Sequence, residues 1–295
     1  MSTTAQPVPF LKGHGTENDF VIIPDPDGRL DLSAAAVARI CDRRAGVGAD
    51  GVLRVVRAAA DPAARALAGE AEWFMDYRNA DGSIAEMCGN GVRVFAHYLR
   101  QAGLVKDGGA GEGLPVATRA GVRRVGFAAN GDVVVDMGAA RLPAGPRASA
   151  TVTVGERGWP ALHVDMGNPH AVAFVDQLTD AGRLFDPPAV TPATAFPAGV
   201  NVEFAVDRGP RHVALRVHER GSGETRSCGT GACAVAVAAA RRDGLDPARD
   251  GETATYTVDV PGGRLVVTEA PDGTVTLTGP AVLVAEGTLD PALLG

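Results

Sequence analysis

Lysine, cysteine and long apolar runs are all scarce in this chain. Only two of its 28 basic side chains are lysines, Lys12 and Lys106, which leaves few candidates for a Schiff base. Four cysteines in 295 residues are too few for a disulfide scaffold, and we expect them to be thiols. The longest run of small apolar residues, Ala232–Ala240, is too short to cross a bilayer.

A basic block is also missing. The formal net charge of −7 is spread along the chain, which argues against nucleic acid and anionic membranes as partners. Residues Met1–Phe10 lack the basic flank and apolar stretch of a signal peptide, which predicts a cytoplasmic protein. We therefore expect a small-molecule substrate.

The pattern of apolar residues predicts a mixed fold with more strand than helix. Short β-branched runs that end at Gly, Pro, Asn or Asp predict strands at Asp19–Ile23, Gly51–Val56, Val133–Met137 and Val213–Val217. Turn signals at Asn130-Gly131, Pro261-Gly262-Gly263 and Asp272-Gly273 predict antiparallel hairpins. Helical periodicity covers Ser33–Arg43, with Ser33 as N-cap, then Gly91–Gln101 and Thr230–Arg242.

Two pairs of similar segments indicate a duplicated domain. Glu86–Val92 around Cys88 resembles Arg226–Ala232 around Cys228, at an offset of 228 − 88 = 140 residues. Asn18–Ile22 aligns with Asn168–Val172, at an offset of 168 − 18 = 150 residues. Two pairs of similar segments, in the same order and at similar offsets, argue against a chance match.

We predict an α/β fold of the α+β type with two pseudo-symmetric lobes. Each lobe is a curved, mostly antiparallel sheet wrapped around a central helix, with the active site in the cleft between the lobes. The N-terminal lobe is expected to span 1–138 and a returning strand in 280–295, and to carry Cys88. The C-terminal lobe is expected to span 139–279 and to carry Cys228.

A Cys-Gly-x-Gly segment before a helix has a chemical interpretation. Unpaired backbone N–H groups converge at a helix N-terminus, and with the positive end of the helix dipole they favour a thiolate. The same N–H groups, at Gly89, Asn90, Gly229 and Thr230, could bind a carboxylate. A tight strand-to-helix turn explains a single such cysteine equally well, but two occurrences, one in each lobe, favour chemistry.

Two thiols that face one ligand suit racemisation. Inverting an α-carbon requires a base on one face and an acid on the other. Because the carbanion is unstable, N–H donors in a dry cleft must stabilise the enolate-like carboxylate when no cofactor does so.

Other roles for the cysteines are less favoured. Cys228 and Cys233 could form half of a zinc site, but the six histidines lie at no ligand-like spacing, so we expect no metal. A disulfide between Cys88 and Cys228 could form on oxidation and would be inactive. Cys41 and Cys233 are predicted to be buried.

With these residues in view, the chain resembles the diaminopimelate epimerase family over nearly its whole length. The resemblance rests on five motifs: His14–Phe20, Asn79–Ser83 leading to Cys88–Gly91, Gly167–His170, Gly199–Phe204, and Glu219–Thr225 leading to Cys228–Gly231.

The resemblance implies conversion of LL-2,6-diaminopimelate to the meso form, for lysine and peptidoglycan, without pyridoxal phosphate, metal or other cofactor. It implies that Cys88 and Cys228 are the two bases and that Gly89, Asn90, Gly229 and Thr230 bind the reacting carboxylate. Asn18, Asn79, Asn168, Asn201, Glu219 and Arg220 would hold the remaining charged groups. His170 and Glu219 are implied to tune the thiols, and a homodimer is a possible assembly.

Two positions depart from the usual family pattern. Gly51 stands where the family often has glutamine, so one contact to the distal end of the substrate is expected to be missing or replaced. Glu17 stands where many members have glycine, which puts the local backbone beside Asn18 in doubt.

Three alternatives remain at this stage. A proline or hydroxyproline racemase shares the two-thiol logic, but its substrate has one charged end, whereas Glu219 and Arg220 favour two. A catalytically inactive amino-acid-binding or scaffold protein would be expected to lack one thiol. A phenazine-type isomerase of similar fold relies on a carboxylate where this chain has cysteine.

Overall fold

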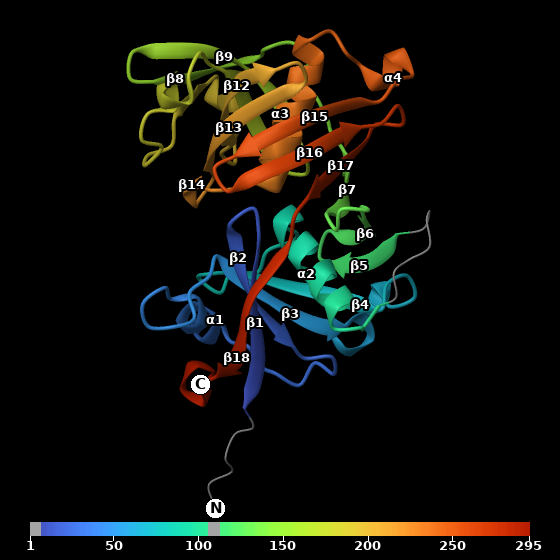
Figure 1. The fold of residues 1–295 in the computed structure, drawn as a ribbon. Coiled ribbons are helices and arrows are strands. Elements are labelled where there is room, and N and C mark those ends of the chain that lie inside the picture. The colour runs from blue at the N-terminus through green and yellow to red at the C-terminus, as the bar shows by residue number, and fades with distance from the viewer. Residues whose placement is uncertain (1–6, 106–112) are drawn as a thin grey trace, which may run out of the picture. The chain divides into compact units, whose positions relative to one another are not determined.

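The computed structural model describes residues 7–105 and 113–295 and divides the chain into two compact units. Unit 1 comprises Met1–Val135 and Pro280–Gly295, and unit 2 comprises Asp136–Gly279. Figure 1 shows the sheet and helices of each unit. No helix within the described ranges is long and apolar enough to span a membrane.

Unit 1 is a sheet around one long helix. Its strands are β1 (Val8–Gly15), β2 (Asn18–Pro24), β3 (Gly51–Arg57), β4 (Trp73–Asn79), β5 (Leu114–Thr118), β6 (Gly121–Phe127), the first part of β7 (Val133–Ala139) and β18 (Val282–Leu289). Its helices are α1 (Ala34–Cys41) and α2 (Gly89–Gln101), with short 3₁₀ turns at Ala58–Ala60, Arg65–Leu67 and Pro291–Leu293. The strands pair in the order β18-β1-β2-β3-β4-β5-β6-β7.

Unit 2 has the same composition of elements. Its strands are β8 (Ala150–Val154), β9 (Arg157–Asp165), β10 (Pro169–Phe174), β11 (Ala189–Thr191), β12 (Asn201–Gly209), β13 (His212–Glu219), β14 (Gly223–Thr225), β15 (Ala254–Val260), β16 (Gly263–Glu269) and β17 (Thr274–Gly279). Its helices are α3 (Gly229–Arg242) and α4 (Pro247–Asp250), with 3₁₀ turns at Leu178–Ala181 and Ala193–Ala195.

The strand pairings of the two units follow one pattern. In unit 1, β1 to β7 pair successively as antiparallel, parallel, antiparallel, parallel, antiparallel and antiparallel. In unit 2, β9, β10, β12, β13, β15, β16 and β17 repeat that sequence of directions. The prediction of two similar, mostly antiparallel α+β lobes is confirmed, and all three predicted hairpin turns join antiparallel strands.

Each sheet encloses its own helix. Helix α2 packs against β1–β5 and β18 of unit 1, and α3 packs against β9, β10, β12, β13 and β15–β17 of unit 2. The middle of α3, from Gly231 to Ala240, is completely buried and consists almost entirely of Ala and Val. Small side chains let the strands approach this helix closely on every side.

Three helix boundaries differ from the sequence prediction. Helix α1 has the predicted N-cap, Ser33, but ends at Cys41 because the Asp42 carboxylate accepts the backbone N–H groups of Arg44 and Ala45. Helices α2 and α3 begin at Gly89 and Gly229, slightly earlier than predicted, so that the preceding cysteine is the N-cap in each case.

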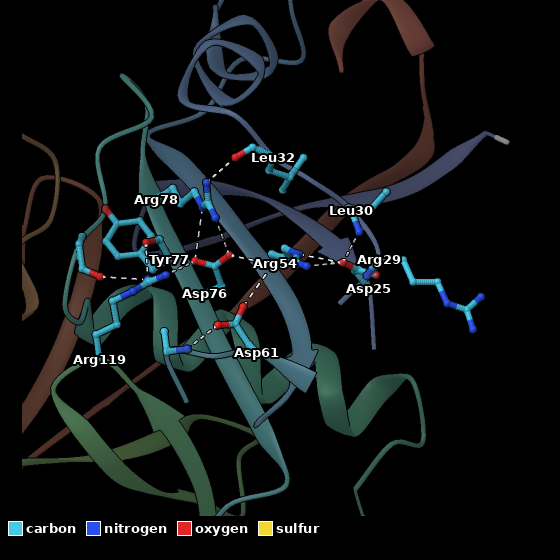
Figure 2. A network of polar contacts seen from close by, with 12 residues as sticks. Asp25, Arg29, Leu30, Leu32, Arg54, Asp61, Asp76, Tyr77, Arg78 and Arg119 are labelled. Atoms are coloured by element: carbon cyan, nitrogen blue, oxygen red, sulfur yellow. Dashed lines mark hydrogen bonds and ion pairs between the residues drawn. The ribbon is translucent and has the colours of Figure 1, made fainter. Parts of the chain in front are cut away.

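A buried ion network supports the strands that lead into α2. Asp76 on β4 has no exposed surface and accepts from Arg119 at 2.5 Å, from Arg78 at 3.2 Å and from Arg54 at 3.4 Å. Figure 2 shows Arg54 continuing the network to Asp25 and Asp61. Burial alone would raise the pKa of Asp76, but the hydrogen bonds from Arg119 and Arg78 lower it. The carboxylate is therefore held charged inside unit 1.

Candidate active site

Cys88 caps the N-terminus of the central helix of unit 1. Its backbone is extended, its Sγ lies 3.4 Å from the backbone N of Gly91, and its carbonyl accepts from Val92 at 2.8 Å. The side chain is half-buried. This places the sulfur among the first N–H groups of α2, where the sequence predicts an anion-binding turn.

Asn18 and Asn90 lie next to Cys88. The Cys88 Sγ is 3.6 Å from Oδ1 of Asn18, and Nδ2 of Asn90 donates to the same oxygen at 3.2 Å. Nδ2 of Asn18 in turn donates to Oδ2 of Asp50 at 2.7 Å. The Asn18 amide is thus held in one orientation by its neighbours on both sides.

Asp50 and Asp19 form a charged group behind Asn18. Arg43 bridges the two carboxylates, with N···O distances of 2.7 Å to each, and Lys12 lies 2.6 Å from Asp19. Burial opposes ionisation of Asp19, yet hydrogen bonds from Arg43 and Lys12 lower its pKa to about 2. Asp19, which shares Arg43 with Asp50, therefore stays charged at physiological pH.

Asn79 ends β4 at the start of the turn that leads to Cys88. Its Nδ2 donates to Oγ of Ser83 at 2.9 Å, and its backbone N donates to the carbonyl of Ser83. Arg119 donates to the carbonyl oxygen of Tyr77 in β4 and to that of Ala85 in the segment between β4 and Cys88. The Asp76 network in Figure 2 thus reaches the backbone of the segment before the cysteine.

Cys228 repeats the arrangement in unit 2. It is the N-cap of α3, its Sγ lies 3.4 Å from the backbone N of Gly231, and its carbonyl accepts from Ala232 at 2.9 Å. Only 5% of Cys228 is exposed. Oγ1 of Thr230 lies 3.5 Å from the sulfur, and Nδ2 of Asn168 lies 3.4 Å from that hydroxyl.

His170 lies on β10 between two oxygen atoms. Its Nδ1 is 2.6 Å from Oε1 of Glu203, and its Nε2 is 3.0 Å from Oδ1 of Asn168. Neither His170 nor Glu203 has exposed surface. The histidine thus connects Asn168 to a buried carboxylate on β12.

The ends of β12 and β13 bring together Asn201, Glu219 and Arg220. The Asn201 side chain accepts from the backbone N of Arg220 at 2.9 Å and donates to the carbonyl of Pro169 at 3.2 Å. The guanidinium of Arg220 is exposed and donates to the carbonyl of Ala198 at 2.8 Å. Glu219 accepts a hydrogen bond from the hydroxyl of Thr225.

The predicted residues therefore form two groups, one in each unit. Unit 1 holds Asn18, Asn79, Cys88, Gly89 and Asn90, and unit 2 holds Asn168, His170, Asn201, Glu219, Arg220, Cys228, Gly229 and Thr230. Each group surrounds a cysteine at a helix N-terminus. No cluster of three or more potential metal ligands occurs among residues 7–105 and 113–295.

At Cys228, burial outweighs the tendency of a helix N-terminus to favour a thiolate. Burial, followed by the charges of Glu219 and Glu203, raises the pKa of Cys228 well above its usual range. Hydrogen bonds from Thr230 and the Gly231 backbone act in the opposite direction but are weaker. The raised pKa favours the thiol form of Cys228.

Glu219 is poised beside this thiol. Burial raises the pKa of Glu219, hydrogen bonds from Thr225 and Cys228 lower it in part, and the charge of Glu203 raises it further. The net direction is upward. A carboxyl group with a raised pKa in the neighbourhood of a thiol is a candidate acceptor for the thiol proton.

Alkylation measures the state of Cys228 directly. At pH 8 we expect iodoacetamide to modify Cys228 of the folded protein at least about 100-fold more slowly than the same residue in urea, because the thiolate is the nucleophile. The rate should continue to rise with pH beyond 9, where a free cysteine approaches its plateau. Mass spectrometry of the Cys228 peptide gives both rates, and a plateau below pH 8 would contradict the raised pKa.

Comparison with known proteins assigns the chain to a family. The model of the family described as diaminopimelate epimerase matches residues 10–143 and 162–284. The diaminopimelate epimerase of Streptomyces coelicolor is 70% identical over 287 residues, 97% of each chain. That of Rhodococcus jostii is 50% identical and covers 95% of this chain and 96% of its own. The chain belongs to the diaminopimelate epimerase family.

Solved structures of more distant proteins share the fold of this diaminopimelate epimerase family member. A phenazine biosynthesis protein of the PhzF family from Bacillus anthracis has a TM-score of 0.68 at 18% identity, covering 97% of this chain and 100% of its own. A hydroxyproline epimerase from Agrobacterium vitis, with trans-4-hydroxy-L-proline bound, has a TM-score of 0.63 at 16% identity, covering 98% and 95%. At these identities the likeness concerns the fold alone.

The two departures from the diaminopimelate epimerase pattern have structural explanations. A Cβ at Gly51 would lie 2.5 Å from the carbonyl oxygen of Arg78 and 2.8 Å from the Tyr77 ring, so this backbone admits no side chain there. Thr16 and Glu17 join β1 to β2 with φ of 50° and 63°, the left-handed region that glycine adopts readily. Glu17 adopts this left-handed conformation, and Asn18 begins β2.

Sequence reasoning missed two residues that support this diaminopimelate epimerase site. Asp50 orients Asn18 through a hydrogen bond, and Glu203 entered the sequence analysis only as part of the motif Gly199–Phe204. The available signal for Glu203 was its position between Val202 and Phe204 in an apolar strand, where an acidic residue is buried unless the strand lies at an edge.

Proposed function

We propose that this enzyme converts LL-2,6-diaminopimelate to meso-diaminopimelate with Cys88 and Cys228 as the two acid/base groups. The observation that carries the proposal is the repeated arrangement in which each cysteine is the N-cap of a central helix, with its sulfur 3.4 Å from the backbone N of Gly91 or Gly231. We propose that the two thiols act on opposite faces of one α-carbon. Family membership supports this substrate.

The mechanism assigns different starting states to the thiols. Because burial raises the pKa of Cys228, we propose that this cysteine starts as the thiol and delivers the proton while Cys88 acts as the base. When the direction reverses, Cys88 must start as the thiol and Cys228 as the thiolate, and we propose that Glu219, whose pKa is also raised, receives the proton of Cys228. The N–H groups of Gly89, Asn90, Gly229 and Thr230 would bind the reacting carboxylate and stabilise its enolate-like form.

The distal end of diaminopimelate requires separate contacts. We propose that Asn18, Asn79, Asn168, Asn201, Glu219 and Arg220 hold the ammonium groups and the second carboxylate. Arg220 fits the carboxylate because an exposed guanidinium offers a bidentate pair of donors. A proline substrate has no second charged end, so this set supports diaminopimelate over proline or hydroxyproline.

Replacing Arg220 tests the distal contact. We expect Arg220→Gln to raise KM for LL-diaminopimelate about 10- to 100-fold with a smaller change in kcat, as for the loss of hydrogen bonds between charged groups. Arg208→Gln is the matched control, because Arg208 is an exposed arginine near the far end of β12. Equal KM values for both variants would exclude Arg220 from substrate binding.

A substrate panel tests the function itself. The purified, reduced enzyme is incubated with LL-diaminopimelate, L-proline and trans-4-hydroxy-L-proline, and the stereoisomers are separated by chiral chromatography. We expect the meso isomer from diaminopimelate and no inversion of the other two. Inversion of hydroxyproline without reaction of diaminopimelate would overturn the assignment.

We also propose that the enzyme acts in the cytoplasm, where thiols remain reduced, and that it forms a homodimer. Light scattering of the purified protein tests the dimer, for which we expect twice the chain mass of 30.1 kDa.

A further inference from the structure

Glu203 is a buried carboxylate with no role in the proposed substrate binding or proton transfer. None of its surface is exposed, and its Oε2 is buried without a hydrogen-bond partner in the described part of the chain. Its Oε1 has one close partner, Nδ1 of His170 at 2.6 Å. Burial of a charge is costly unless a partner compensates it. The contact with His170 therefore offsets the cost of burying the Glu203 carboxylate.

The contact depends on a glycine of the Cys-Gly-x-Gly segment. Oε1 of Glu203 lies 2.8 Å from the point where a Cβ of residue 231 would stand. A side chain at Gly231 would therefore displace the carboxylate from its position beneath α3. The second glycine of the segment thus makes room for Glu203 in addition to shaping the turn.

The hydrogen-bond partners of His170 determine its protonation. Nδ1 faces a carboxylate oxygen of Glu203, and Nε2 faces the amide oxygen of Asn168 at 3.0 Å. Both oxygens are acceptors, and an imidazole nitrogen can donate only when it carries a hydrogen. The short distance to Glu203 is typical of a charge-assisted hydrogen bond. Donation from the ring to both oxygens at once requires hydrogen on both ring nitrogens.

The second of these hydrogen bonds fixes the Asn168 amide. Because Oδ1 of Asn168 faces the histidine, its Nδ2 points to Oγ1 of Thr230, 3.4 Å away. That hydroxyl lies 3.5 Å from Sγ of Cys228. A continuous series of polar contacts thus runs from the buried carboxylate to the thiol.

We propose that Glu203 is a positioning residue of this epimerase, which holds His170 doubly protonated so that the ring fixes the Asn168 amide beside Thr230 and Cys228. The inference rests on the proposed function, in which Asn168 and Thr230 bind the substrate. His170 then has no lone pair to accept a proton from the thiol. Of the two groups implied to tune the thiols, Glu219 is the proton acceptor and His170 holds Asn168 in place.

The charges around the pair are consistent with this division of roles. Glu219 and Cys228 both experience the charge of Glu203, which raises their pKa values, while His170 lowers the pKa of Glu219. The pKa of His163 is lowered by burial and, more weakly, by the charge of His170. A positive ring beside Glu203 reduces the net negative charge near the thiol.

Nitrogen-15 NMR of the histidine rings tests the proposal in the substrate-free enzyme. Protein labelled at histidine is measured at neutral pH, and the His170→Gln variant identifies the signals of His170 by their loss. We expect both ring nitrogens of His170 to carry hydrogen in the wild type. In Glu203→Gln, a neutral amide accepts from Nδ1 without stabilising a second proton, so Nε2 should lose its hydrogen.

Kinetics of the same variant test the effect on the site. We expect Glu203→Gln to raise KM for LL-diaminopimelate about tenfold, because the Asn168 amide must reverse to donate to Nε2. Glu269→Gln is the matched control, because Glu269 is a buried carboxylate of unit 2 that pairs with Arg241 and lies outside the site. This control should retain wild-type KM and the wild-type protonation of His170.

The outcomes separate this inference from the proposed function. A wild-type His170 ring with one unprotonated nitrogen would overturn the positioning role, and so would a Glu203→Gln variant with unchanged ring protonation and KM. The wild-type spectrum decides the protonation even if Glu203→Gln fails to fold. A doubly protonated ring in an enzyme that does not exchange the α-proton of diaminopimelate would support the ring assignment and contradict the substrate.

Discussion

Replacing either Cys88 or Cys228 with serine is expected to lower kcat/KM for LL-diaminopimelate by about three orders of magnitude and to leave the fold intact. General acid/base catalysis by one side chain contributes about 10²- to 10⁴-fold, and a serine hydroxyl is far too weak an acid to replace a thiol. Both cysteines are helix N-caps, a position that serine fills well. Steady-state kinetics and circular dichroism of the two variants measure both expectations.

Cys233 provides the control for these variants. It is a buried thiol in the interior of α3, five residues after Cys228, and it is not at the helix N-terminus. We expect Cys233→Ala to keep kcat/KM within about twofold of wild type, since it removes a thiol without touching the proposed acid/base pair. If Cys88→Ser or Cys228→Ser kept more than a tenth of wild-type activity, the two-thiol mechanism would be wrong.

Replacing Asp76 with asparagine is expected to lower the free energy of unfolding by about 3–5 kcal/mol. Arg54, Arg78 and Arg119 all lie within 3.4 Å of this fully buried carboxylate, and the variant leaves them without its charge (Figure 2). Urea unfolding monitored by circular dichroism measures the change. Because Arg119 also holds the segment before Cys88, kcat/KM should fall together with stability.

Asp27→Asn is the control for this stability effect. Asp27 pairs with Arg57 at 3.1 Å in the same unit, but both side chains are about half exposed, with 49% and 48% of their surface accessible. Surface pairs contribute roughly 0–1 kcal/mol, so this variant should unfold close to wild type. Equal losses in the two variants would show that burial of the Asp76 network has no special energetic role.

The Asp76 network also predicts the direction of acid unfolding. Its arginine partners lower the pKa of Asp76 in the folded state below the unfolded value of about 3.9. The carboxylate therefore stabilises the fold above pH 4, and that contribution is lost as the pH falls through the lowered folded pKa. Asp19, with a folded pKa of about 2, adds to the same loss at low pH.

The sequence predicted the architecture because the architecture is repeated. One Cys-Gly-x-Gly turn before a helix carries little information, but two turns at similar offsets indicated two similar lobes, and the strand pairings of the two units follow the same order. The end of α1 was missed because Asp42 accepts two backbone N–H groups, a local competition that periodicity does not reveal.

The chemistry of the site was less predictable from sequence. The helix N-terminus at Cys228 was visible in the sequence, but the charges of Glu203 and Glu219, which lie on other strands, also act on the thiol. Their charges and the burial of the sulfur depend on tertiary packing, and together they reverse the expected direction of the pKa. The structural reason for glycine at position 51 also depends on tertiary packing, because the backbone carbonyl that excludes a side chain there belongs to the neighbouring strand.

Two thiols that act on opposite faces of one carbon leave a direct isotopic signature. Reduced wild-type enzyme and the variants Cys88→Ala and Cys228→Ala are each incubated with LL-diaminopimelate in deuterated water and followed by proton NMR. We expect the wild type to replace the α-proton with deuterium while forming the meso isomer, and neither variant to form it. Absence of exchange by reduced wild-type enzyme, or formation of the meso isomer by a single-thiol variant at the wild-type rate, would contradict the two-thiol mechanism.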